Sequence, residues 1–261
     1  MLRITTLLLF VQLSLTGFSQ TDSVIYSPVQ SKFTFDWGNN LTTLLLTQYG
    51  PRTEIVMIHL HDNESASAKA AKKVLERTGG LLIQVQNKEK RLMHFKKSGK
   101  SFLFDPNRIF TPAGIRQNLR FLNNHVTSAA LSSVKAFSAF ILQKIPNSAT
   151  ILIALHNNNN GKYSINSYRG NGSHKKDASM VYANKKNDPD NFFIVTDKQL
   201  FKKLKAEKYN VILQNNAKAK DDGSLSVYCG KIKIGYVNVE AEQGSMEEQV
   251  RMLRSLRAFV K

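Results

Sequence analysis

Two apolar runs in this protein each lead into a histidine, and this pattern limits the folds that the sequence can adopt. Residues 55–60 (IVMIHL) run into His61, with Glu64 completing a His-x-x-Glu spacing, and residues 151–155 (ILIAL) run into His156. Such runs are typical of strands buried in the middle of an α/β sheet. Because open α/β sheets build their sites at the carboxyl ends of their strands, we expect the three side chains to share one edge.

Two imidazoles and one carboxylate form a common ligand set for catalytic zinc, in which three protein groups leave the fourth position to water. A histidine at a strand end can instead have a structural role as a hydrogen-bonding residue, and a single His-x-x-Glu motif is short. Two strands that each deliver a histidine favour a metal site. We therefore expect one Zn²⁺ ion, with His61, Glu64 and His156 as its ligands.

A third motif supplies groups that can recognise a carboxylate. Residues 104–110 (FDPNRIF) place Asn107 and Arg108 between aromatic residues, after a proline that restricts the backbone. The planar guanidinium of arginine presents a fork of donors suited to a carboxylate, and asparagine adds a neutral donor. In isolation the segment is also compatible with a turn that carries a surface arginine, so its interpretation depends on the two histidine motifs.

The order of these motifs resembles that of the zinc carboxypeptidase family, including its succinylglutamate desuccinylase and aspartoacylase relatives. That family has His-x-x-Glu first, then Asn-Arg, then a histidine after a strand, and finally a glutamate on a last strand near the C-terminus. The last feature is matched here by residues 235–244 (GYVNVEAEQG). The resemblance spans roughly residues 50–250 and implies a zinc-carboxypeptidase-like fold.

This resemblance also implies a role for each matching residue. The two histidines and Glu64 would bind zinc, and Arg108 with Asn107 would hold the free carboxylate of the substrate. A glutamate would act as the general base. Glu240 ends the Val-x-Val strand pattern and matches the family position better, while Glu242 is the alternative because it shares the same face if the strand continues. Arg91 corresponds to an arginine that stabilises the oxyanion, but a solvated arginine fits this Lys- and Arg-rich region equally well.

The rest of the sequence alternates strands with helices. This predicts a single α/β domain whose central mixed, largely parallel and twisted sheet has helices on both faces. Residues 157–172 follow His156 directly and are expected to line the pocket, while the polar residues 173–191 are expected to form an insertion. Helices are expected at residues 66–76, 112–121, 128–144, 198–205 and 246–259. Strands are expected at residues 21–36 on the sheet edge, 42–46, 53–60, 81–86, 91–95 paired with 101–104, 150–155, 192–196, 211–214, 226–228 and 232–239.

The first 20 residues have the pattern of a secretory signal, with a basic start, an apolar stretch and small residues near a cleavage point. No later run reaches the ~20 apolar residues that span a bilayer. We therefore expect residues 1–20 to be removed and residues 21–261 to form the catalytic domain of a secreted or periplasmic protein without a transmembrane anchor. The one cysteine, Cys229, is expected to pack in the core as a small hydrophobic residue within a strand.

The protein has 37 Lys and Arg residues against 19 Asp and Glu residues, a formal net charge of +18. A basic surface attracts polyanions, although plainly solvated charge explains the composition as well. The sequence contains no recognised nucleic-acid-binding motif, which argues against specific nucleic-acid recognition. For an exported protein, the expected partners are an anionic cell-envelope polymer and a peptide or N-acyl amino acid substrate.

Together the motifs favour a secreted zinc-dependent amide or peptide hydrolase. Such an enzyme would use metal-activated water to remove a terminal residue or acyl group from a carboxylate-bearing peptide or N-acyl amino acid. The alternative is a catalytically inactive, carboxypeptidase-like binding protein of the cell envelope. An exported nucleic-acid binder that depends on charge alone leaves the ordered His, Glu and Arg motifs unexplained.

Overall fold

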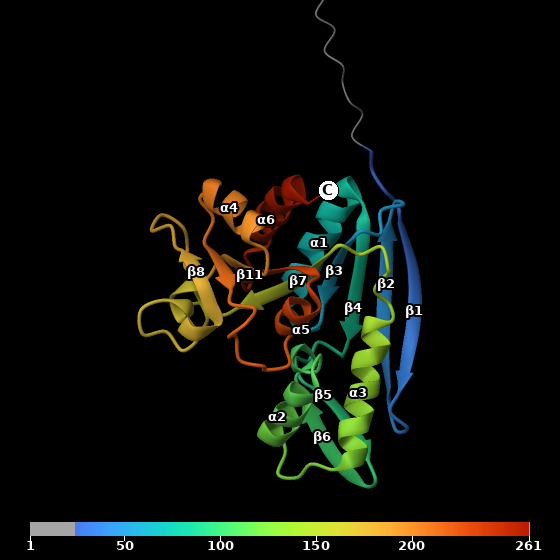
Figure 1. Cartoon of the computed structure of the whole chain (residues 1–261). Coiled ribbons are helices and arrows are strands. Elements are labelled where there is room, and N and C mark those ends of the chain that lie inside the picture. The colour runs from blue at the N-terminus through green and yellow to red at the C-terminus, as the bar shows by residue number, and fades with distance from the viewer. Residues whose placement is uncertain (1–23, 261) are drawn as a thin grey trace, which may run out of the picture.

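The structure, a computed structural model, describes residues 24–260, so the signal peptide predicted at residues 1–20 lies outside the described residues. Within them, a nine-stranded sheet crosses the molecule in the order β1-β2-β4-β3-β7-β11-β9-β10-β8 (Figure 1). The strands are β1 (Pro28–Asp36), β2 (Leu41–Tyr49), β3 (Ile55–His59), β4 (Gly80–Gln86), β7 (Ile151–Asn158), β8 (Ala178–Tyr182), β9 (Phe192–Val195), β10 (Val211–Gln214) and β11 (Gly235–Glu242).

The centre of the sheet is parallel and its flanks contain antiparallel pairs. Strands β4, β3, β7 and β11 run parallel to one another, whereas β1–β2, β2–β4, β9–β11 and β8–β10 are antiparallel. The predicted mixed, largely parallel sheet is therefore confirmed, and β1 lies at the predicted edge. The carboxyl ends of β3, β7 and β11 consequently lie side by side.

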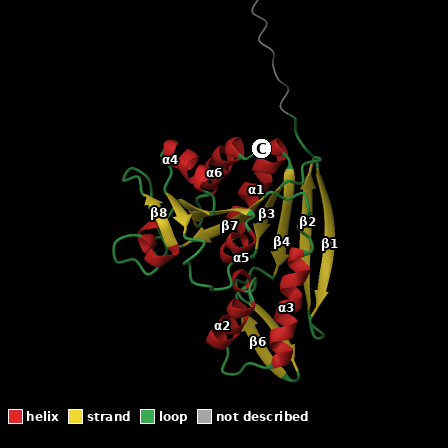
Figure 2. Ribbon diagram, in the orientation of Figure 1, coloured by secondary structure: helices red, strands yellow, loops and turns green. Residues whose placement is uncertain are grey.

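Helices cover both faces of the sheet, as predicted (Figure 2). One apolar cluster joins the sheet to α1 (Ser65–Thr78), α4 (Lys198–Ala206) and α6 (Met246–Phe259). A second cluster joins the opposite face to α2 (Pro112–Leu122), α3 (Ser128–Leu142), α5 (Leu225–Ile232) and the hairpin of β5 (Met93–Lys97) and β6 (Lys100–Phe104). None of the helices between residues 24 and 260 is long and apolar enough to cross a membrane.

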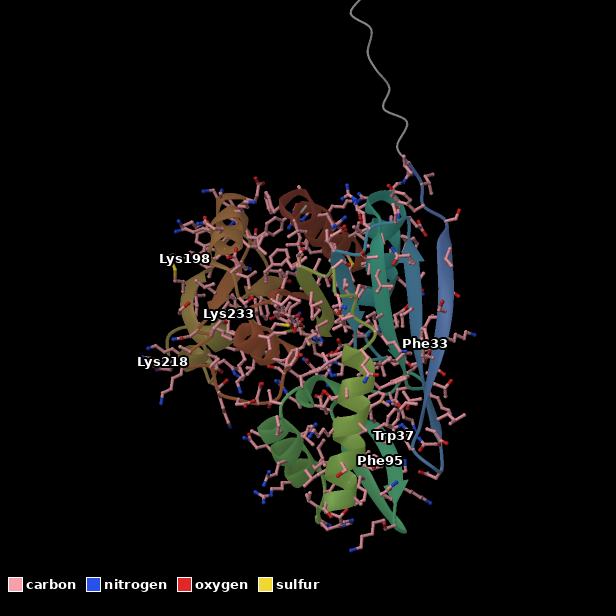
Figure 3. All side chains as sticks on the ribbon, turned by 45° about the vertical axis from the view of Figure 1, so that its right-hand side comes forward. Phe33, Trp37, Phe95, Lys198, Lys218 and Lys233 are labelled. Atoms are coloured by element: carbon pink, nitrogen blue, oxygen red, sulfur yellow. The ribbon has the colours of Figure 1, made fainter. Side chains whose placement is uncertain are left out.

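Aromatic packing attaches the β5–β6 hairpin to the main sheet. Trp37, at the end of the β1–β2 hairpin, stacks on Phe95 of β5 with a centroid separation of 4.6 Å and meets Phe137 of α3 at 5.0 Å. Figure 3 shows Trp37 and Phe95 side by side, on the far side of the molecule from Lys198 and Lys218. Burying several aromatic rings together fixes the segment that leads from β6 into the Asn-Arg motif.

A third, smaller apolar cluster lies at the other end of the sheet. It joins Ile165 and Tyr168 of the short 3₁₀ helix η2 (Ile165–Tyr168) to Phe192, Ile194 and Ile212 of the sheet. The segment after β7 therefore folds back over the sheet. The predicted insertion at residues 173–191 contains the 3₁₀ helix η3 (Lys175–Asp177) and the edge strand β8, a short strand of half-buried and exposed residues that the sequence did not predict.

One predicted element is wrong. Residues 226–228 were expected to form a strand, and they lie instead in helix α5. The hydroxyl of Ser224 caps the start of this helix by accepting a hydrogen bond from the N–H of Val227, and Lys233 ends it in a left-handed conformation with φ of 60°. Leu225 and Cys229 then share the buried face, so Cys229 packs in the core as expected, although on a helix.

Candidate metal centre and active site

The predicted site residues meet at the carboxyl edge of the parallel strands. His61 follows the end of β3, and Glu64 is the residue immediately before α1. His156 lies in β7, in register with Glu240 of the adjacent parallel strand β11. Because side chains alternate along a strand, Val237, Val239 and Ala241 point into the core on one face, while Asn238 and Glu240 point toward the site.

His61, Glu64 and His156 are buried, and one ligand atom from each lies within 4.8 Å of the other two. Nδ1 of His61 is 3.0 Å from Oε1 of Glu64, and Nδ1 of His156 is 3.0 Å from Oε2 of the same carboxylate. The two Nδ1 atoms are 3.3 Å apart. Two imidazole nitrogens that converge on one carboxylate form a donor set that suits zinc, so these residues fit a divalent metal ion.

The surroundings favour an ionised carboxylate at this position. Burial by itself would raise the pKa of the Glu64 carboxyl, but His156 and His61 hold that pKa well below its ordinary value. Burial would lower the pKa of His61, whereas hydrogen bonds with Asp105 and Glu64 raise it to about 9. The Glu64 carboxylate therefore stays ionised between the two imidazoles.

Asp105 positions His61, and the sequence interpretation missed this role. Oδ1 of Asp105 is 2.8 Å from Nε2 of His61 and also accepts the N–H of Asn107 at 2.8 Å. Such a carboxylate fixes the orientation and tautomer of a ligating imidazole. The signal was available, because Asp105 directly precedes the Pro106-Asn107-Arg108 motif that attracted attention for another reason.

Buried amides hold Glu64 and His156 in place. The N–H of Asn157 donates to Oε2 of Glu64 at 3.1 Å, and Nε2 of Gln249, from α6, donates to the carbonyl oxygen of His156 at 2.9 Å. Asn157 and Gln249 also bond to each other at 2.9 Å. His59 also contacts the backbone of Glu64, with Nε2 3.0 Å from the Glu64 carbonyl oxygen. These contacts restrict the movement of the convergent side chains.

The two glutamates left open by the sequence occupy different places. Glu240 is 5% exposed and accepts a hydrogen bond from Nδ2 of Asn238 at 3.1 Å. Burial raises the pKa of its carboxyl, an effect that His156 opposes in part. Glu240 lines the same cavity as Glu64 and His156, whereas Glu242, half-buried at the end of β11, does not.

Arg91 and Asn107 both reach the metal-ligand group. Nη1 of Arg91 bonds Oε1 of Glu64, and Nη2 is 3.8 Å from Oδ2 of Asp105, while the side chain stays 48% exposed. Nδ2 of Asn107 is 3.4 Å from Nε2 of His156, so the amide lies beside the second histidine. Arg91 is thus neither buried nor purely solvated.

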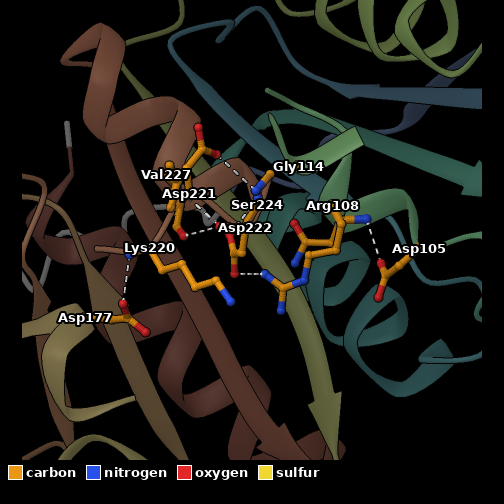
Figure 4. A network of polar contacts seen from close by, with 12 residues as sticks. Asp105, Arg108, Gly114, Asp177, Lys220, Asp221, Asp222, Ser224 and Val227 are labelled. Atoms are coloured by element: carbon orange, nitrogen blue, oxygen red, sulfur yellow. Dashed lines mark hydrogen bonds and ion pairs between the residues drawn. The ribbon is translucent and has the colours of Figure 1, made fainter. Parts of the chain in front are cut away.

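Arg108 ends the 3₁₀ helix η1 (Pro106–Arg108) and lines the same cavity, which has a volume of about 430 Å³. Its Nη1 atom bonds Oδ2 of Asp222, a residue of the segment that leads into α5 (Figure 4). Burial would lower the pKa of the guanidinium, but Asp222 and Asp105 raise it. Asp222 is a second residue that the sequence interpretation missed.

The segment after His156 forms the opposite wall of the cavity, as predicted. Tyr163 and Tyr168 both line it, and their hydroxyl groups are hydrogen-bonded to each other. Burial raises the pKa of both phenols. Tyr228, by contrast, packs near Phe110 with a centroid separation of 6.3 Å and does not line the cavity.

Comparison with solved structures finds proteins similar to this one at low identity. Thrombin activatable fibrinolysis inhibitor is 9% identical with a TM-score of 0.48, over 91% of this protein and 69% of that one. A succinylglutamate desuccinylase/aspartoacylase from Rhodobacter sphaeroides is 12% identical with a TM-score of 0.45, over 91% and 66%. An aspartoacylase family protein from Mesorhizobium loti is 15% identical with a TM-score of 0.40, over 89% and 70%.

No family model matches the sequence, and no curated protein matches it. Two of these similar structures carry the names of the desuccinylase and aspartoacylase relatives of the family that the motif order resembles. The chemical interpretation of the site depends on the geometry of its own residues.

Proposed function

We propose that the protein is a zinc-dependent amide or peptide hydrolase that acts on a carboxylate-bearing peptide or N-acyl amino acid. The observation that supports this most is the convergence of His61, Glu64 and His156, because Glu64 and His156 line one cavity with Glu240 and Arg108. A buried ligand set beside a buried carboxylate and a guanidinium combines the groups that amide hydrolysis needs.

His61, Glu64 and His156 would hold the metal through Nδ1, the carboxylate and Nδ1. A zinc ion bound there supplies Lewis-acid polarisation of a carbonyl group and lowers the pKa of water to ~7. Asp105 keeps His61 in the orientation that presents Nδ1 to the ligand cluster. Asn157 and Gln249 keep the other ligands in place.

Glu240 is the residue that we assign as the general base. Its buried carboxyl has a raised pKa, which makes the carboxylate a better proton acceptor than an exposed glutamate. Glu240 would accept a proton from the attacking water and then pass it to the leaving nitrogen. The hydrogen bond from Asn238 orients this carboxylate toward the cavity.

The cationic side chains would bind and polarise the substrate. Arg91 faces the ligand cluster and would stabilise the negative charge that develops on the carbonyl oxygen. Arg108, supported by Asn107, would hold the substrate carboxylate. We further propose that the protein is exported and that its basic surface attaches it to an anionic cell-envelope polymer.

The test compares two glutamates on the same strand. Glu240→Gln should leave zinc content unchanged and lower hydrolysis of a panel of peptides and N-acyl amino acids by about 10²–10⁴-fold, the usual contribution of a general base. The matched change Glu242→Gln should keep most of the activity, and chelation should abolish the activity of the unmodified protein until zinc is added back.

Zinc content is measured by elemental analysis and turnover by release of free amine. Full activity in Glu240→Gln would remove Glu240 as the base. Normal zinc content without hydrolysis of any substrate in the panel would contradict the hydrolase proposal. It would favour the alternative, a catalytically inactive binding protein of the cell envelope.

A further inference from the structure

The guanidinium that the proposed function assigns to the substrate carboxylate already has a carboxylate partner. Nη1 of Arg108 donates to Oδ2 of Asp222 (Figure 4). The Arg108 side chain is 39% exposed and that of Asp222 is 35% exposed. Both line the cavity that Glu64 and His156 also line. A ligand that reaches Arg108 from this cavity therefore also meets Asp222.

Backbone packing holds Asp222 in this position. The adjacent residue Gly223 lies directly against Gly114, and a Cβ on Gly223 would be 2.4 Å from the carbonyl oxygen of Arg108 and 2.6 Å from Cα of Gly114. The N–H of Phe110 donates to the carbonyl oxygen of Gly223 at 2.9 Å. Side chains larger than hydrogen do not fit between these segments, so Arg108 and Asp222 are brought together by the fold.

Hydrogen bonds and ion pairs of the neighbouring side chains add to this restraint. Oδ1 of Asp222 accepts the N–H of Ser224 at 2.9 Å. The adjacent Asp221 accepts the hydroxyl of Thr111 at 2.6 Å and pairs with Nζ of Lys231 at 2.5 Å. Asp222 is therefore a fixed part of the cavity wall, on the segment that caps α5.

The charges around this pair select for a particular ligand. A lone carboxylate would gain the remaining donors of Arg108 but would be repelled by Asp222 at close range. A group with a carboxylate and an ammonium on the same carbon satisfies both, because the ammonium binds Asp222 while the carboxylate binds Arg108. Lys220 lines the same cavity and supplies a second positive charge for the carboxylate.

The direct contact between Arg108 and Asp222 also excludes a more distant ammonium. The ammonium of a lysine side chain is several bonds away from its own carboxylate, so it would extend past an aspartate that touches the arginine. The α-ammonium of a free amino-acid end lies at the required short separation. The amide to be cleaved must then be on the side chain, because the α-nitrogen is free.

We propose that Asp222 determines specificity, and that the substrates are amides formed on the side-chain nitrogen of an amino acid whose α-ammonium and α-carboxylate are both free. This inference rests on the proposed hydrolase function. Water adds across the amide bond of that side chain, so that the carbonyl carbon takes the hydroxyl group and the nitrogen leaves as the amine with the proton.

The experiment uses matched substrate pairs. The first members are Nγ-acetyl-2,4-diaminobutyrate, Nδ-acetylornithine and Nε-acetyllysine. The second members lack only the α-amino group: 4-acetamidobutanoate, 5-acetamidopentanoate and 6-acetamidohexanoate. Hydrolysis is measured as kcat/KM with the zinc-loaded protein, and binding is measured by calorimetry with the Glu240→Gln variant, so that affinity is known without turnover.

At the best substrate length, the amino-acid member should bind about ten to a hundred times more tightly than its partner, the range expected for a hydrogen-bonded ion pair. Asp222→Asn should remove most of this preference and leave the binding of the deaminated partner equal or stronger. Asp221→Asn is the matched control, because Asp221 bonds Thr111 and Lys231 rather than Arg108, and it should keep the preference. Thermal unfolding verifies that both variants are folded.

The outcomes separate the two proposals. Equal binding within each pair, or a preference that Asp222→Asn leaves intact, would overturn the assignment of Asp222 even if the protein hydrolyses other amides. Preferential, Asp222-dependent binding without hydrolysis of any member would support the assignment while contradicting the hydrolase function.

Discussion

At the scale of single residues, the orientation of His61 depends on one carboxylate. Oδ1 of Asp105 is 2.8 Å from Nε2 of His61, so the opposite ring nitrogen is presented to the ligand cluster. Replacing Asp105 by Asn keeps the shape but removes the charge and weakens control of the tautomer. We expect Asp105→Asn to lower zinc affinity about 10–100-fold, as carboxylates of this kind do in other metal sites, measured by competition with a chelator.

Asp62→Asn is the control for this prediction. Asp62 is adjacent to His61 in sequence, but its Oδ2 atom accepts the N–H groups of Asn87 and Glu89 rather than touching the ring. The two variants change the net charge equally. If both lost zinc affinity to the same extent, long-range charge rather than orientation of His61 would explain the effect.

Residue types and spacing were sufficient to predict that His61, Glu64 and His156 lie together, because the two histidines come at the ends of apolar runs that the sequence reveals. The residues that contact His61 and Arg108 were harder to find. Asp222 contacts Arg108 across 114 positions of sequence, and their proximity depends on how two loops pack. Such a long-range contact cannot be predicted from the residues adjacent to either partner. Asp105 stood inside a recognised motif, but only the structure connects it to His61.

At the scale of elements, the packing of two glycines joins η1 and α2 to the start of α5. Gly223 has φ of +79° and has no room for a Cβ next to the Arg108 carbonyl oxygen. We expect Gly223→Ala to lower the free energy of unfolding by about 1–2 kcal/mol for the left-handed backbone, plus about 1–3 kcal/mol for overpacking. Urea unfolding measures the total.

Gly99→Ala separates the two contributions. Gly99, in the β5–β6 turn, has a similar φ of +74°, and nothing lies within 4 Å of a Cβ built there. The free energy of unfolding of this variant should fall only by the cost of the left-handed backbone. If the free energy of unfolding fell equally in the two variants, the close contact between Gly223 and Gly114 would add nothing to the cost of a side chain at residue 223.

Most elements were predictable because hydrophobic periodicity is a local property. Buried parallel strands such as β3 and β7 are apolar over most of their length, and amphipathic helices such as α6 repeat their apolar residues at helical spacing. The eight residues of α5 were ambiguous, since a short apolar run fits a strand or a helix. Capping by Ser224 and the left-handed Lys233 decided the outcome.

At the scale of the whole molecule, His61 and His156, two of the proposed metal ligands, lie at the carboxyl ends of β3 and β7, which contribute residues to both large apolar clusters. A metal that binds only the folded protein adds stability according to its concentration and affinity, ~2.7 kcal/mol at one hundred times Kd. For a domain of this size that corresponds to roughly 5–10 °C in Tm. We expect saturating zinc to raise Tm by this amount and a chelator to reverse the increase, as followed by thermal unfolding.

His156→Ala should abolish the response to zinc. His94→Ala is the matched control, because His94 is exposed on β5 and does not belong to the ligand cluster. A zinc-dependent increase that persisted in His156→Ala would place the metal elsewhere on this basic, histidine-containing protein.

The cavity wall that follows His156 has a small apolar core of its own, the third cluster. Tyr168 and Ile165 rest on Phe192, Ile194 and Ile212 rather than on β3 and β7. An engineer could therefore diversify this wall by recombining whole loops, while the strand ends that carry His61 and His156 stay intact. Inheritance of new specificities along a lineage would follow the same division, with the loop varying and the strand ends remaining fixed.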